Sequence, residues 1–137
     1  MKKVYPVIFT LADDVLLVEV PDLGIFTEGE NMADAIEMAR DAIGINGISR
    51  EDHGEKIPEA TAINDINLEK GTFSTEGRSI VSLIDIDFDI YRRKFDEKTV
   101  RRNVTLPNWL NQEAEKAQLN VSKVLQEALM TKLGVSR

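Results

Sequence analysis

The chain has no cysteine and only one histidine among its 137 residues. The lack of cysteine excludes disulfide bonds and thiolate metal sites, and one imidazole, His53 in a loop rich in glycine and glutamate, makes a poor catalytic set. No run of about eighteen apolar residues is present, so the sequence predicts no membrane span. The first residues also lack the apolar stretch of a signal peptide. A cytoplasmic protein without a cofactor is the simplest interpretation.

Two other kinds of site are not favoured by the pattern. The glycines lack the strand-to-helix spacing of a phosphate-binding loop. Asp85, Asp87 and Asp89 alternate, so in a strand they would share one face, as carboxylates around a hard cation do. Because Asp87 or Asp89 also suits the N-cap of a helix, a capping role is preferred, and the sequence predicts neither a metal site nor catalysis.

Charge is unevenly distributed along the chain. Residues 1–96 carry 10 Lys and Arg against 20 Asp and Glu, a balance of −10, whereas residues 97–137 carry 7 against 4, a balance of +3. An acidic body attracts basic surfaces and repels phosphate, and a basic segment does the opposite. An acidic surface also serves solubility alone. The asymmetry indicates two different partners without naming either.

The first part of the chain predicts a β-β-β-α-β unit. Three short runs rich in β-branched and aromatic residues predict strands: 4–11, 15–20 and 25–28. Asn31 suits the N-cap of an amphipathic helix that Gly44 or Gly47 would end. After a polar, glycine-containing segment, the apolar run 80–84 predicts a fourth strand, and 85–94 a strand end that passes into a short helix.

Residues 100–107 predict one short strand in front of two helices. Side chains alternate along a strand, so Val104 and Leu106 share an apolar face. The opposite face is polar: Arg101, Asn103 and Thr105. A guanidinium, an amide and a hydroxyl without a carboxylate among them suit base edges in the DNA major groove, where a two-stranded ribbon fits and Arg reads guanine and Asn adenine.

The two helices that follow predict a phosphate contact and a dimer. Pro107 suits the first turn of a helix that ends near Gln118-Leu119-Asn120, where Asn tolerates the left-handed conformation that a helix end often needs. Ser122 is predicted to N-cap a second helix that ends at Gly134. A helix start presents free N–H groups, so Ser122 and Lys123 are placed to hold a backbone phosphate. About 40 residues cannot bury their own core. The single strand therefore predicts a homodimer through its pairing with a second copy.

This order of elements resembles the ribbon-helix-helix family over residues 99–134. The motifs are Arg-Asn-Val-Thr-Leu-Pro before one helix and Leu-Asn-Val-Ser before the next. The resemblance implies an antiparallel ribbon of two chains in the major groove. It places Arg101, Asn103 and Thr105 on bases, and Ser122 and Lys123 on phosphate. Arg102 departs from the pattern, since the apolar face usually carries an aliphatic residue there.

The acidic part resembles the HicB antitoxin family. Its motifs are an aromatic-Pro strand at Tyr5, Pro-Asp-Leu at 21–23, Thr-Glu-Gly at 27–29 before a helix, and Gly-Glu-Lys-Ile-Pro-Glu at 54–59. One branch of that family carries a C-terminal ribbon-helix-helix domain. The fold implied is α+β, and it has two domains: a HicB-like, partly ribonuclease-H-like domain at 1–95 and a ribbon-helix-helix dimerisation domain at 99–137.

The HicB resemblance implies a non-enzymatic type II antitoxin. Such a protein occludes a HicA-type toxin, a small basic mRNA-cleaving ribonuclease, and represses its own operon by dimeric binding to operator DNA; higher oligomers fit the same scheme. Toxin contact is expected at the sheet edge around Tyr5, Phe9 and Asp22. Two alternatives stay open: a ribbon-helix-helix regulator whose N-terminal domain senses a small-molecule ligand, and a surviving nuclease of the ribonuclease H type.

Overall fold

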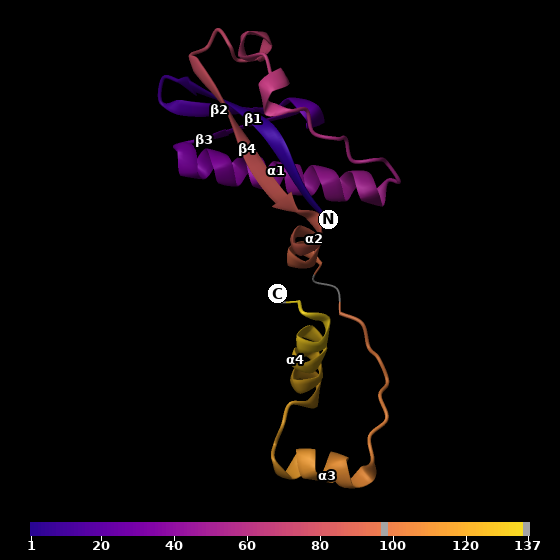
Figure 1. Cartoon of the computed structure of the whole chain (residues 1–137). Coiled ribbons are helices and arrows are strands. Elements are labelled where there is room, and N and C mark those ends of the chain that lie inside the picture. Colours follow the sequence, from indigo (N-terminus) through magenta and orange to yellow (C-terminus); the bar gives the residue numbers. More distant parts are fainter. Residues whose placement is uncertain (97–98, 136–137) are drawn as a thin grey trace. The chain divides into compact units, whose positions relative to one another are not determined.

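The computed structural model describes residues 1–96 and 99–135, and the chain divides into two compact units, Met1–Phe95 and Asp96–Arg137 (Figure 1). The described residues form one sheet and four α-helices, which confirms the α+β class. Unit 1 holds the sheet and the first two helices, and unit 2 the other two: α1 (Met32–Asp52), α2 (Phe88–Phe95), α3 (Asn108–Lys116) and α4 (Val121–Leu133).

The sheet of unit 1 is antiparallel throughout, in the order β3-β2-β1-β4. Its strands are β1 (Lys2–Ala12), β2 (Val15–Val20), β3 (Ile25–Gly29) and β4 (Arg78–Asp87). All four were expected from the sequence, in the expected places. β4 is longer than the apolar run 80–84 because it pairs along β1 from Lys2 opposite Asp87 to Leu11 opposite Arg78. Pairing thus extends the strand over polar residues.

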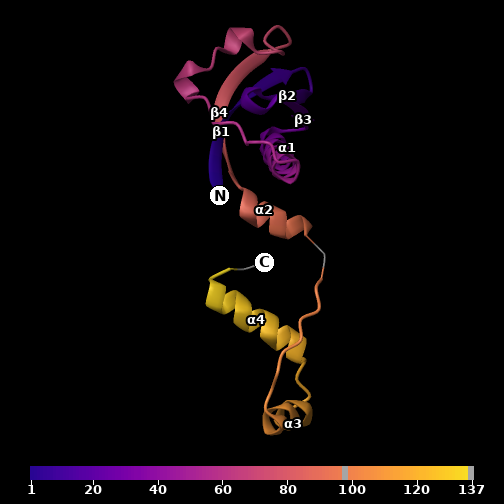
Figure 2. The same cartoon turned by 90° about the vertical axis from the view of Figure 1, so that its right-hand side faces the viewer.

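The core lies between one face of the sheet and α1. Alternate side chains of the strands point to this face, where they pack against small and branched residues of the helix. Eight of the core side chains are completely inaccessible to solvent: Tyr5, Val7, Phe9, Val18, Val20, Ala35, Ala39 and Ile43. Figure 2 shows α1 on one side of the sheet and the 3-10 turns of residues 63–70 on the other.

α1 continues through Gly44 and Gly47, so the expected end of this helix at either glycine is wrong. Both glycines are buried because side chains of α2 lie directly on them. A methyl group added to Gly44 would lie 2.5 Å from Cδ1 of Tyr91, and one on Gly47 would lie 2.2 Å from Cε1 of Phe88. The glycines serve close packing of two helices here, not the termination of one.

The caps expected for the helices of unit 1 are confirmed. The Asn31 side chain accepts a hydrogen bond from the N–H of Asp34 at 2.9 Å, at the start of α1. At the start of α2 the carboxylate of Asp87 accepts from the N–H groups of Asp89 and Ile90, at 3.0 and 3.3 Å. Each cap satisfies donors that a helix start leaves unpaired.

Both tyrosines of the chain are buried in unit 1, which makes alkaline pH a test of the fold. The Tyr5 hydroxyl donates to the carbonyl oxygen of Pro58 at 2.6 Å, and the Tyr91 hydroxyl donates to the carboxylate of Asp41. Burial raises the pKa of Tyr5 to about 12, and burial with the Asp41 hydrogen bond raises the pKa of Tyr91.

In the unfolded chain a tyrosine ionises at a pKa of about 10, whereas in the folded chain both pKa values are higher. The difference stabilises the folded state. This stability is fully present below a pH of about 10 and is lost as pH rises through the folded-state pKa values. We expect tyrosinate absorbance to appear above pH 10 in one step that coincides with the loss of the circular dichroism signal. Reversible ionisation of both tyrosines near pH 10 without unfolding would contradict their burial.

Candidate functional sites

Unit 2 has no core of its own. None of its described residues is buried, and eleven of its large apolar side chains are 38–80% exposed. They are Val100, Val104, Leu106, Trp109, Leu110, Leu119, Val121, Val124, Leu125, Leu129 and Leu133. So much apolar surface in so short a segment marks an interaction surface. The unit completes a core only against another surface.

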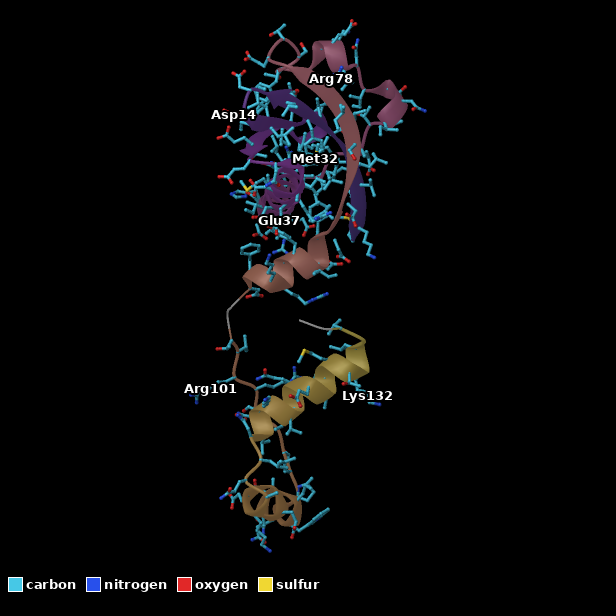
Figure 3. The ribbon with its side chains drawn as sticks, turned by 90° about the vertical axis from the view of Figure 1, so that its left-hand side faces the viewer. Asp14, Met32, Glu37, Arg78, Arg101 and Lys132 are labelled. Carbon is cyan, nitrogen blue, oxygen red and sulfur yellow. The ribbon has the colours of Figure 1, made fainter. Side chains whose placement is uncertain are left out.

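Residues 99–106 are not a strand in the single chain, where a strand was expected. Strand hydrogen bonds need a neighbouring strand, and the described part of this chain offers none to the segment. The polar residues expected to face bases are all exposed, and their side chains make no hydrogen bond within residues 1–96 and 99–135: Arg101, Asn103 and Thr105. Figure 3 labels Arg101 in this segment.

The cap of α4 differs from the prediction. Its N-cap is Asn120, whose side chain accepts from the N–H of Lys123 at 3.1 Å, so the capping role expected for Ser122 is wrong. Between α3 and α4 the residue with a left-handed backbone conformation is Gln118, with φ 55°, and not Asn120 as expected. Ser122 lies in the exposed first turn of α4. The predicted end of the helix at Gly134, with φ 66°, is confirmed.

The three residues expected to contact a toxin do not form an exposed edge. Tyr5 and Phe9 lie in β1, a central strand, and both are fully buried on the α1 side, so their expected edge position is wrong. Asp22 holds the fold together. Its carboxylate accepts from the N–H of Thr61 at 2.9 Å and from the Thr61 hydroxyl at 2.5 Å. The side chains of Tyr5 and Phe9 are therefore not accessible to a partner in this chain.

Exposed carboxylates of unit 1 gather where β1 turns into β2 and β3 leads into α1. Leu16 pairs with Gly29, which brings the end of β3 beside that turn. No Lys or Arg occurs between Lys3 and Arg40. Five carboxylates here are exposed and form no ion pair within the described chain. We call these the acidic end: Asp13, Asp14, Glu28, Glu30 and Glu37.

Asp14 and Glu37 of the acidic end are labelled in Figure 3, as is the exposed Met32 at the start of α1. Total charge alone could not locate this surface, because its members come from a turn, an edge strand and a helix. The absence of Lys and Arg between Lys3 and Arg40 was the feature of the sequence that could have located this surface. The charge balance summed over residues 1–96 did not reveal it.

The alternating aspartates do not converge on a cation. Asp85 pairs with Arg40 at 3.0 Å, Asp87 caps α2, and Asp89 binds the amino group of Met1. Among the described residues no group of three or more His, Asp or Glu side chains is placed to hold a metal ion. Nor does that part of the chain contain a helix long and apolar enough to cross a membrane.

Comparison with known proteins assigns the chain to a class. The sequence profile of HicB-like antitoxins of bacterial toxin-antitoxin systems matches residues 5–129, which takes in most of both units. The protein is an antitoxin of a bacterial toxin-antitoxin system. More narrowly, it belongs to the HicB-like antitoxin family.

Two solved structures share the fold. One is a chain of a toxin-antitoxin complex from Streptococcus pneumoniae, 22% identical, with a TM-score of 0.61 and coverage of 96% of this chain and 99% of that one. The other is the antitoxin HicB of Burkholderia pseudomallei, 22% identical, with a TM-score of 0.51 and coverage of 96% of each chain. No curated protein matches the sequence.

Proposed function

We propose that this antitoxin binds and occludes a small basic ribonuclease of the HicA type through unit 1, and represses its own operon by binding operator DNA as a dimer through unit 2. The observation that carries the proposal is the open apolar surface of unit 2, in the part of the chain that has a charge balance of +3. Its single extended segment and two helices complete a core when a second copy supplies the same elements.

In such a dimer, residues 100–106 of two copies pair as an antiparallel ribbon. Val104 and Leu106, 51% and 38% exposed in the single chain, turn toward the helices. The opposite face then presents Arg101, Asn103 and Thr105 to base edges in the major groove. At the start of α4 the N–H groups of Val121 and Ser122, beside Lys123, suit a backbone phosphate, since Asn120 occupies only the N–H of Lys123.

Arg101→Ala is expected to weaken operator binding by about 1–3 kcal/mol, the value of one bidentate contact to a base. The loss should depend on the operator sequence, because the contact reads a base edge. Lys123→Ala is the matched comparison: it removes a phosphate contact, so it should weaken binding to operator and unrelated DNA alike. Mobility shifts on both DNAs check this, and equal losses for Arg101→Ala on the two would contradict base contact.

For the toxin, the acidic end supplies the electrostatic attraction that a small basic protein needs. Reversing two of its charges with Asp13→Lys and Asp14→Lys is expected to slow association by roughly tenfold at low salt, and less at high salt because ions screen exposed charges. Asp65→Lys with Glu69→Lys is the matched control, since both residues are exposed in the segment on the other face of the sheet. Stopped-flow association rates that fall equally for both pairs would contradict a localised toxin site.

The ligand-sensing alternative has one structural feature in its favour, an open hollow of about 320 Å³ beside α1 and α2. It is lined by Ile45, Ile48, His53 and Phe95 among others, and the His53 ring Nδ1 is already engaged by the carbonyl oxygen of Ser49. A ligand site needs polar groups that converge on its occupant. The hollow therefore gives less support than the charge and shape of the two units give to antitoxin action.

The test of the proposed function is co-purification with the product of the neighbouring gene, followed by a promoter mobility shift. We expect a small basic partner whose RNA cleavage this chain suppresses, and a shifted promoter. A shifted promoter without a partner would favour the ligand-sensing regulator. Metal-dependent RNA cleavage by the pure chain would favour the nuclease.

A further inference from the structure

β3 is a terminal strand of the sheet, with β2 on one side only. Figure 1 shows it beside the start of α1. Both neighbours hold it in place: β2 pairs with it from Ile25 to Gly29, and a methyl group added to Gly29 would lie 2.4 Å from the backbone nitrogen of Ala35 in α1. A strand that pairs with the free side of β3 therefore meets backbone that is already ordered, which favours binding.

The hairpin of β1 and β2 shows which backbone groups of β3 face outward. A two-residue loop joins Ala12 to Val15, and the residues that flank such a loop exchange both of their backbone hydrogen bonds. Both backbone groups of a residue point to one side, and the side alternates along the strand. The residue three positions after Val15 thus points to β3, where it pairs with Thr27. Phe26 and Glu28, on either side of Thr27, therefore point their N–H and carbonyl groups away from the sheet.

Two kinds of side chain lie along this free side. The Phe26 ring is 54% exposed and meets the Phe73 ring edge to face, with 5.8 Å between the ring centroids. Glu28, two residues further along the same face of the strand, is an exposed member of the acidic end, and Glu30 follows it. The edge thus offers open backbone groups, an apolar ring and carboxylates together.

We infer that a strand of the basic toxin adds to β3 and pairs with the backbone of Phe26 and Glu28. The inference rests on the proposed function, in which unit 1 binds this toxin. No backbone group outside the sheet, among residues 1–96 and 99–135, occupies the outward groups of these two residues, so they supply about four hydrogen bonds. An apolar side chain of the added strand would lie opposite Phe26 and a Lys or Arg opposite Glu28, since residues directly opposite share a face.

Charge selects a basic strand as the occupant and β3 as the place. No Lys or Arg lies between Lys3 and Arg40, so this stretch of the chain supplies no cation to the carboxylates beside the edge. A second copy would bring its own Glu28 to this edge, and like charges repel. The other edge strand, β4, has no charged residue in 79–84, so it offers a cation no partner there.

Residue-resolved amide hydrogen exchange tests the place, in the full chain alone and saturated with the product of the neighbouring gene. We expect exchange of the Phe26 and Glu28 N–H groups to slow by about 100-fold or more in the complex. Val81 and Leu83 are the matched control, because their partners in β1 point to β2 and their own N–H groups point outward from β4. Their exchange should change by less than about threefold.

The outcomes separate this inference from the proposed function. A complex that suppresses RNA cleavage without slowing exchange at Phe26 and Glu28, or that protects both edges of the sheet equally, would overturn the pairing and leave the proposed function standing. Absence of any complex would overturn both.

A pair of variants tests the backbone contact itself. Phe26→Pro removes the outward N–H, which an edge strand tolerates when that group faces solvent, and Phe26→Val removes the ring but keeps the N–H. We expect toxin affinity to fall about tenfold further for Phe26→Pro than for Phe26→Val, the effect of one lost hydrogen bond. Equal affinities, with both variants folded by circular dichroism, would contradict the backbone pairing. Exchange in the unchanged chain decides the question if Phe26→Pro does not fold.

Discussion

Val104→Asp is expected to abolish operator binding and to leave toxin neutralisation intact. The Val104 side chain is 51% exposed in the single chain and lies on the apolar side of the extended segment. Pairing of two copies would bury it, so the substitution places two carboxylates in a small core, at a cost of several kcal/mol. Unit 2 has no buried residue within its described range to offset this cost. Operator affinity should fall by more than about 100-fold.

Thr105→Asp, one residue further along, is the variant that distinguishes the role of the polar face of the segment from the role of its apolar face. Its side chain points to the opposite side, where a carboxylate repels phosphate but does not enter the core. We expect this variant to lose operator binding and to stay dimeric in light scattering, whereas Val104→Asp loses both. If Val104→Asp bound the operator with unchanged affinity, the apolar side of the segment would not be buried in the DNA-binding form.

The strands of unit 1 could be predicted because each one corresponds to a local pattern in the sequence. In that pattern a short run rich in β-branched and aromatic residues lies between two polar turn segments. The starts of α1 and α2 could be predicted for the same reason, since a cap lies within three residues of the N–H it accepts. The end of α1 could not. A glycine near the end of a helical pattern commonly marks the end of the helix, whereas the Tyr91 and Phe88 rings that require Gly44 and Gly47 come more than forty residues later.

The exposed edge position expected for Tyr5 and Phe9 was wrong for a different reason. The aromatic-Pro motif marks a family position, and a family position says nothing about exposure. The alternation of Tyr5, Val7 and Phe9 already indicated one buried face, and the structure puts all three in the core. For the residues proposed to face DNA the alternation is a local pattern that the sequence shows. The strand that we propose to order them would need a second chain to pair with.

The N-cap of α4 shows how closely two local signals can compete. Asn120 and Ser122 are both good N-cap residues, and they lie two positions apart. The structure uses Asn120, which leaves Ser122 within the first turn. The phosphate contact stays a proposal, and Ser122 and Lys123 both lie in the first turn of α4, where a helix presents N–H groups that lack partners within the helix.

Gly47→Ala is expected to destabilise unit 1 although alanine favours a helix. Intrinsic propensity alone would stabilise α1 by about 1 kcal/mol. The new methyl group, however, would lie 2.2–2.8 Å from three atoms of the Phe88 ring, which is 2% exposed and has no room to withdraw. Overpacking of this kind costs about 1–3 kcal/mol and occasionally more, and the short distances here put the cost at the upper end of that range. We expect a net loss of about 2 kcal/mol, a fall in Tm of roughly 8–16 °C for a domain of this size.

Two further variants test the cause. Ser49→Ala, at an exposed position of the same helix, should change the free energy of unfolding by less than about 0.5 kcal/mol. Phe88→Leu shortens the side chain that the methyl group would meet, so Gly47→Ala combined with it should cost less than the sum of the two single changes. A rise in Tm for Gly47→Ala alone would mean that helix propensity outweighs the contact. The packing of α2 on α1 would then be looser than these distances imply.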